Sequence, residues 1–185
     1  DEEIEKIANN PAKPTFQNTV LALETSGVDL ARAAGIFYNL TGSNTNPKLQ
    51  AIDEEYAPIF SAHNDKIYLN SQLYKRFKAL NLNALKGEDQ KLTQYYLQQF
   101  ELAGANLSLA DKEKMKKINE ELASLGTLFG NKLLIARKNG AVLFDNATDL
   151  DVLSADEIAA SKAKATEAGK DGKYLIGLLN TTQQP

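Results

Sequence analysis

A single histidine limits the chemistry that this sequence can perform. Among its 185 residues only His63 carries an imidazole, whereas an H-E-x-x-H zinc motif or a pair of E-x-x-H diiron motifs needs at least two. His63 falls on the apolar face of a predicted helix, where a histidine is usually half-buried and hydrogen-bonded to a neighbour. We therefore predict a structural histidine rather than a catalytic or metal-binding one.

Carboxylates are more plentiful than imidazoles. Asp53, Glu54 and Glu55 are consecutive, as are Glu120 and Glu121, and paired carboxylates can serve acid–base catalysis. Because consecutive residues of a helix point in different directions, these groups are not expected to converge on one substrate atom. We interpret them as solvated charges.

Four aspartates share the spacing of positions one, five, seven and twelve of a calcium-binding loop: Asp145, Asp149, Asp151 and Asp156. Such a loop also needs an oxygen ligand at its third position and a glycine at its sixth, but here these are Ala147 and Leu150. The match fails where the geometry is strictest, so we predict no calcium site.

The segment 169–173, Gly-Lys-Asp-Gly-Lys, resembles a phosphate-binding loop only superficially. It lacks the G-x-x-x-x-G-K-[ST] spacing, and it follows a predicted helix instead of starting one. We predict a turn. The sequence thus offers no catalytic, cofactor-binding or metal-ligating residue, and the chain as given is not expected to be a complete enzyme.

Composition and charge exclude further classes of function. With 21 basic and 24 acidic residues the net charge is −3, so nucleic acid is not an expected partner. The basic cluster Lys112–Lys117 is interrupted by Glu113 and is typical of a solvated helix face. No apolar run approaches the roughly 20 residues that cross a membrane. The absence of cysteine excludes disulfides and cysteine-ligated metals.

The longest predicted element is a helix from Ser108 to Asn139, with a capping-box-like start at Ser108 and Asp111. Lysines and glutamates between Lys112 and Glu121 are expected on its solvent side. Its large apolar residues recur at spacings of three and four and predict a buried stripe: Met115, Ile118, Leu122, Leu125 and Phe129.

A second long helix is predicted over residues 15–40, with Thr15 as its N-terminal cap. Gly27 and Ala34 lie on its apolar stripe, and small residues let a neighbouring backbone approach closely. Gly126 and Gly130 offer a match on the longest helix. We therefore predict that these two helices pack tightly.

Shorter helices complete the helical part. Residues 1–9 form one, and two prolines keep the following segment extended. Asn46-Pro47 starts another, which Pro58 should bend. Asn70 and Gly87 start two more. The helix that starts at Asn46-Pro47 carries these residues on one face: Leu49, Ile52, Tyr56, Ile59, His63 and Ile67.

After Asn139 the periodicity changes. Residues 141–145 and 174–180 are predicted strands, separated by a helix that a Ser154–Glu157 capping box opens. The predicted fold is mainly α: an antiparallel bundle of long helices at 1–139, then a small strand pair with one helix at 140–185. Because a two-stranded sheet is marginal alone, we expect the chain to continue into a further domain.

Four segments resemble the N-terminal region of bacterial peptidyl-dipeptidases of the thimet-oligopeptidase-like zinc metallopeptidase family. They are Phe16–Gly27, Asn64–Tyr74, Phe100–Asn106 and Leu178–Pro185, in the same order. The resemblance implies a largely helical zinc enzyme that releases dipeptides from the C-terminal ends of oligopeptides. Its active site would lie in a channel between two helical halves.

The resemblance also sets what this chain is expected to do. The family's H-E-x-x-H helix and further glutamate ligand lie downstream of the matched region, so no zinc or catalytic residue transfers to this sequence. We expect an N-terminal domain, inactive alone, that forms part of the channel wall. Its partners would be a C-terminal catalytic domain of the same chain and short peptides, in the cytoplasm unless the enzyme is exported.

An alternative remains open: a free-standing helical module that binds proteins or peptides. The two readings differ in whether an H-E-x-x-H motif follows in the same reading frame. For the domain reading, a second apolar edge of the longest helix is expected to face the absent partner: Leu128, Leu133, Leu134 and Ile135.

Overall fold

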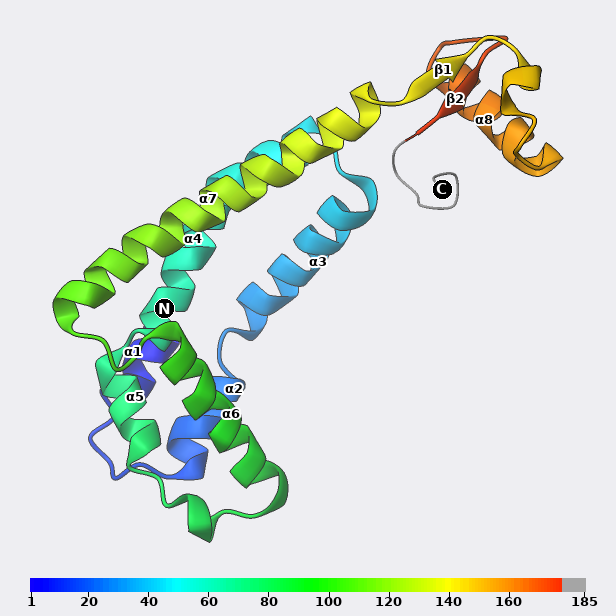
Figure 1. Ribbon diagram of the computed structural model, residues 1–185. Helices are drawn as coiled ribbons and strands as arrows, with labels where there is room; N and C mark the ends of the chain where they lie inside the picture. The colour runs from blue at the N-terminus through cyan, green and yellow to red at the C-terminus, as the bar shows by residue number, and fades with distance from the viewer. Residues whose placement is uncertain (178–185) are drawn as a thin grey trace. The chain divides into compact units, whose positions relative to one another are not determined.

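The computed structural model describes residues 1–177 and is mainly helical, which confirms the predicted fold class (Figure 1). It divides into two compact units, Asp1–Thr127 and Leu128–Pro185, described separately below. Residues 178–185 lie outside the described part. They include the end of the second predicted strand and the segment Leu178–Pro185 that contributes to the family resemblance.

The core of the first unit is built mainly by five elements, most of them short. These are α1 (Glu2–Ala8), the π-helical turn η1 (Phe16–Leu21), α2 (Ala22–Glu24), α5 (Ser71–Lys78) and α6 (Gly87–Ala103). Val20, Leu73, Phe77 and Phe100 are fully buried there. The rings of Phe77 and Phe100 lie 5.0 Å apart, within the range of favourable aromatic pairs.

Arg76 fixes the proline-rich connection between α1 and η1. Its guanidinium donates to the carbonyls of Asn10 (2.5 Å) and Ala12 (3.1 Å), and to the side chains of Asn18 (3.0 Å) and Thr19 (3.2 Å). The arginine is itself buried. A buried charge of this kind is tolerable because its two terminal nitrogens make four hydrogen bonds, although Nε has no partner among the described residues. The extended segment predicted around the prolines is thus held from inside the core.

The predicted continuous helix over residues 15–40 is wrong, because the chain breaks at Gly27. The hydroxyls of Thr25 and Ser26 donate to helical carbonyls, which draws them out of the regular helical pattern. Gly27 adopts φ +68°, a left-handed conformation that glycine accepts without steric cost, and its N–H donates to Glu3 Oε2 at 2.7 Å. The predicted Thr15 cap is confirmed, as a capping box with Asn18.

Two of the three long helices start at caps that the sequence predicted, and α3 does not. Helix α3 (Val28–Asn44) comes after the Gly27 break, and α4 (Pro47–Tyr68) starts where Asn46 Oδ1 accepts hydrogen bonds from the backbone. Helix α7 (Leu109–Asn139) starts at Ser108, whose hydroxyl accepts from the Asp111 N–H at 3.1 Å. Asn70 caps α5 in the same way. The starts of α4, α5 and α7 confirm the predictions, because they depend on neighbouring residues alone.

Lys112 corrects the prediction of a fully solvated basic face on α7. Its side chain is buried, at 3% exposure of the residue, and Nζ donates to the Leu69 carbonyl (3.0 Å) and the Ser71 hydroxyl (2.6 Å). About two helical turns beyond Lys112, Asn119 Nδ2 donates to Asp65 Oδ1 at 2.7 Å. Lys112 and Asn119 are seven residues apart and share one face, so polar contacts set which side of α7 meets α4.

The predicted burial of the apolar stripe on α7 is therefore wrong. Ile118, Leu122 and Leu125 are 51%, 61% and 53% exposed, because the helix turns its Lys112–Asn119 face toward α4 instead. The predicted close packing of glycines is wrong as well. A Cβ built at Gly27, Gly126 or Gly130 would meet no described atom within 4 Å.

The second unit confirms the predicted strand–helix–strand order. Strands β1 (Val142–Phe144) and β2 (Tyr174–Ile176) pair antiparallel, with Val142 opposite Ile176. Between them lie a 3₁₀ turn, Ala147–Leu150, and α8 (Ala155–Glu167), which opens with the predicted Ser154–Glu157 capping box. Leu150 and Ala165 are its buried apolar residues among those described.

Candidate functional site

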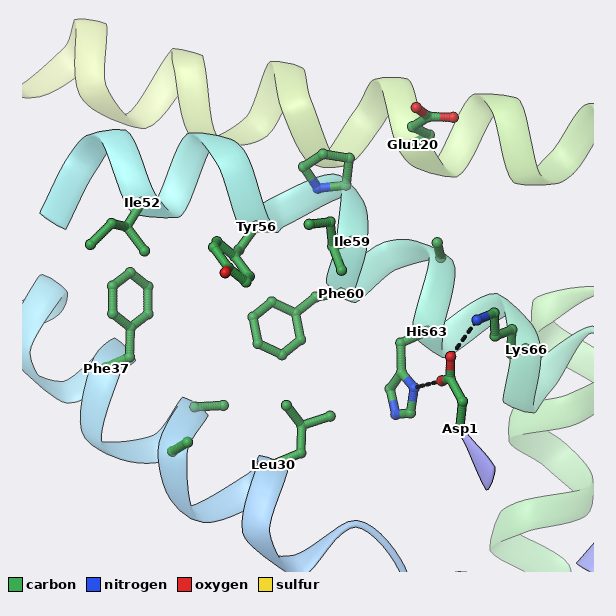
Figure 2. A pocket seen from close by; sticks show the side chains of 14 residues that line it. Asp1, Leu30, Phe37, Ile52, Tyr56, Ile59, Phe60, His63, Lys66 and Glu120 are labelled. Carbon is green, nitrogen blue, oxygen red and sulfur yellow. Dashed lines mark hydrogen bonds and ion pairs between the residues drawn. The ribbon is translucent and has the colours of Figure 1, made fainter. Parts of the chain in front are cut away.

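The largest apolar hollow that we describe in the first unit lies between α3 and α4 and measures about 740 Å³ (Figure 2). We call it the α3–α4 groove. Its lining is dominated by aliphatic and aromatic side chains, which is the usual character of ligand or docking pockets. From α3 and α4 these include Leu30, Ala33, Ala34, Phe37, Ile52, Tyr56, Ile59, Phe60 and His63.

Helical spacing explains why these residues meet in one groove. Leu30, Ala34 and Phe37 recur at four and three residues along α3, and Ile52, Tyr56 and Ile59 do the same along α4. Figure 2 shows Leu30 and Phe37 pointing from α3 toward Phe60 and Ile52 of α4. The sequence correctly assigned these residues to apolar faces, but the two faces do not close on each other.

The groove is open enough to leave large apolar side chains in solvent. Ile59 is 54% exposed, and Leu30, Ile52 and Tyr56 are also exposed. Tyr38 and Phe60 bring their rings within 5.8 Å near the lining. Because these side chains are about half exposed, each forgoes only part of the roughly 1.5 to 3 kcal/mol of transfer free energy that full burial would supply. The arrangement is suited to binding an apolar surface.

His63 closes one end of the groove and is engaged within the unit. Its Nδ1 lies 2.7 Å from Asp1 Oδ1, and Lys66 forms an ion pair with the same carboxylate. Burial lowers the pKa of His63, and the charge of Lys66 lowers it further, so at neutral pH the neutral imidazole donates through Nδ1. With its side chain 22% exposed, His63 is the half-buried, hydrogen-bonded histidine that the sequence predicted.

The predicted carboxylate groups do not assemble into an acid–base pair. Burial raises the pKa of Asp53, and repulsion by Glu54 adds to the effect. Glu54 and Glu55 are exposed along α4. Glu120 borders the groove, whereas Glu121 is exposed on α7. Their separation follows from the helical geometry that the sequence already indicated.

The calcium-like and phosphate-like segments lie in the second unit. Asp145 forms an ion pair with Lys173 at 2.8 Å, and 169–173 is a turn in which Gly169 and Gly172 have φ of +69° and +79°. Within residues 1–177 there is no group of three or more His, Cys, Asp or Glu side chains that could hold a metal ion. Nor does any helix in that range have the length and apolarity to cross a bilayer.

Comparison with known proteins gives the relationship. No family model matches the chain. It is 42% identical to the dipeptidyl carboxypeptidase of Escherichia coli strain K12 over 187 aligned residues. The chain is a relative of the thimet-oligopeptidase-like peptidases, and it matches their N-terminal part. The alignment covers 99% of this chain and 28% of the E. coli protein.

Two further relatives of this peptidase family agree. The dipeptidyl carboxypeptidase of Salmonella typhimurium is 41% identical over 99% of the chain. The oligopeptidase A of Haemophilus influenzae is 24% identical over 91% of it. The chain spans about 28% of the length of the first and 25% of the second. The family resemblance found in the sequence is thereby confirmed.

The α3–α4 groove was not predicted as a site, although the sequence of α3 carries a signal for it. Helix α3 carries only two charged residues, Asp29 and Arg32, in its 17 positions. A helix that is apolar on most of its faces belongs in an interior. Its sequence therefore indicates burial, which the described residues do not provide.

Proposed function

We propose that this chain is the N-terminal domain of a zinc metallopeptidase that releases C-terminal dipeptides from oligopeptides. It forms part of the wall of the substrate channel and has no peptidase activity alone. The observation that supports this most directly is the 42% identity to a dipeptidyl carboxypeptidase over 99% of the chain. Identity at this level along a whole domain is difficult to reconcile with an unrelated role.

The zinc of such an enzyme is held outside this chain. The one imidazole, on His63, is hydrogen-bonded to Asp1, and residues 1–177 offer no cluster of three metal-ligating side chains. These residues do not fit a zinc site. The domain contributes shape and support, and the zinc chemistry belongs to the remaining part of the peptidase.

Three smaller proposals accompany this function. We place the boundary between the helical domain and the strand–helix–strand segment at 139/140, where α7 ends and β1 soon begins at Val142. The two compact units divide earlier, between Thr127 and Leu128 inside α7. The domain's partners are the catalytic domain of the same protein and short peptides. The protein acts in the cytoplasm, as the resemblance implies, unless it is exported.

A mixing experiment tests the proposed function. The 185-residue chain and the remainder of the longer protein are produced separately, and dipeptide release from an oligopeptide with a free C-terminus is followed by mass spectrometry. We expect no release from the chain alone and a rate that rises when the two parts are mixed. A remainder that works at the full-length rate by itself would show that the domain is dispensable.

A further inference from the structure

Helix α3 is the element whose sequence and surroundings agree least. It carries the large apolar residues Val28, Leu30, Ile36, Tyr38 and Leu40, all exposed. None of its 17 residues, all within the described range, is buried. By contrast, α5 has eight residues and buries four of them. An apolar helix with so many exposed side chains lacks a packing partner that would bury them.

The shape of the α3–α4 groove fits a second apolar element. Phe37 and Phe60 form part of its lining, and Ala33 and Ala34 leave room for another backbone to approach along α3. The polar groups at its end are already satisfied by one another, since Asp1 accepts from both His63 and Lys66. The lining is therefore suited to bind an apolar surface and not a charged ligand.

The extent of the relatives indicates what the cover is. The chain matches 28% of the E. coli protein, so about 72% of that relative's length lies outside the match. A peptidase of this family thus has ample further polypeptide that must pack against its N-terminal part. A second copy of this chain would instead have to compete with that covalently linked partner, whose effective concentration is high.

We propose that the α3–α4 groove is the docking site for an apolar segment of the remaining part of the same peptidase. This inference rests on the proposed function. On docking, the segment buries Leu30, Ile52 and Ile59 and completes the interior that α3 lacks. The groove is thus an interface within the larger protein and leaves the peptide substrate to other surfaces.

Cysteine accessibility tests the proposal, because this chain has no cysteine of its own. Ile59→Cys places a thiol in the groove, and Leu102→Cys places one on α6 at a residue that is 72% exposed. Labelling by a maleimide is followed by mass spectrometry of the peptide that holds each position. We expect the groove thiol to react at least tenfold more slowly in the longer protein than in the 185-residue chain, while the α6 thiol reacts equally in both.

Each other outcome is decisive. Equal labelling of Ile59→Cys in both proteins, or equal protection at both positions, would overturn the docking site. Protection that grows with the concentration of the 185-residue chain would assign the groove to a second copy, and protection that appears only with added oligopeptide would assign it to substrate. Dipeptide release by the longer protein is measured in parallel, so that a failed proposed function is recognised separately from a failed docking site.

Discussion

Two groups of helices in the first unit differ in how far they bury their apolar residues. Helices α1, α5 and α6 with η1 bury Val20, Leu73, Phe77 and Phe100 completely. Helix α3 is as long as α6, at 17 residues, and α7 has 31, yet α3 buries nothing and α7 buries only Lys112 among its described residues. Caps and propensity therefore decide that a helix forms, whereas a partner decides whether its apolar face is buried.

The largest expected effect comes from a substitution in the core that α5 and α6 help to build. Phe100→Ala removes a ring that packs on Phe77 (5.0 Å), Tyr68 (5.4 Å) and Tyr74 (5.7 Å). We expect the free energy of unfolding to fall by about 3 to 5 kcal/mol, measured by urea denaturation. The matched control is Phe129→Ala on α7, at 69% exposure, which should change it by less than about 0.5 kcal/mol. Equal losses would contradict the distinction between the two regions.

Arg76 tests the same core through its polar contacts. Arg76→Met keeps much of the side-chain volume but leaves the acceptors of Asn10, Ala12 and Asn18 without their donor. We expect a loss of about 1 to 3 kcal/mol in the same denaturation assay. Lys86→Met, at an exposed position, is the control. A loss no larger than the control's would show that the extended segment is held by something else.

Gly27 lies between α2 of the core and the exposed helix α3, and its substitution tests how the chain breaks there. Gly27→Ala forces a left-handed conformation, φ +68°, on a residue with a Cβ, at a cost of about 1 to 2 kcal/mol. Gly35→Ala lies inside α3, where a Cβ meets no atom within 4 Å. It should raise helix content and stability by up to about 1 kcal/mol. Circular dichroism and thermal melts measure both, and a stabilising Gly27→Ala would place the break elsewhere.

The smallest effect concerns the polar contact between α4 and α7. Burial raises the pKa of Asp65 above its ordinary 3.8, although the hydrogen bond from Asn119 opposes this. Between the ordinary and the raised pKa the folded state binds the extra proton, so Asp65 costs stability as the pH rises through that window. Asp65→Asn cannot ionise. We expect its stability relative to the unmodified chain to increase as the pH rises from below 3.8, measured by denaturation at several pH values.

A control for this pH effect is available on the same helix. Glu55→Gln, at an exposed position, should show no such trend relative to the unmodified chain. If the stability of Asp65→Asn relative to the unmodified chain instead falls as the pH rises, the folded state favours the ionised carboxylate. The contact with Asn119 would then outweigh burial.

Local residues explain most of what the sequence could predict. The caps at Thr15, Asn46, Asn70 and Ser154 were correct because each depends on a side chain and a backbone N–H two or three residues away. The strand–helix–strand order near the C-terminus was correct for the same reason. The predicted half-buried position of His63 also followed from its own helix face.

The errors came from interactions between residues far apart in sequence. The break at Gly27 is reinforced by Glu3, 24 residues away, which accepts a hydrogen bond from the Gly27 N–H. The orientation of α7 depends on Leu69, 43 residues from Lys112. The apolar stripe of α7 shows how residues suited to burial can remain exposed, since Ile118, Leu122 and Leu125 lie off the face that Lys112 orients. Periodicity identifies such a stripe but does not identify its partner. Leu128, Leu134 and Ile135 of the second apolar edge are exposed, and the contact of this edge with a further part of the protein stays a prediction.

Hydrogen exchange of the α3 amides tests the central claim most directly. In the 185-residue chain, α3 should exchange far faster than α6, whose Thr93 and Phe100 are fully buried. In the longer peptidase α3 should become protected while α6 changes little. Slow exchange of α3 in the 185-residue chain, at the rate of α6, would show that its apolar face is already covered and would contradict the account.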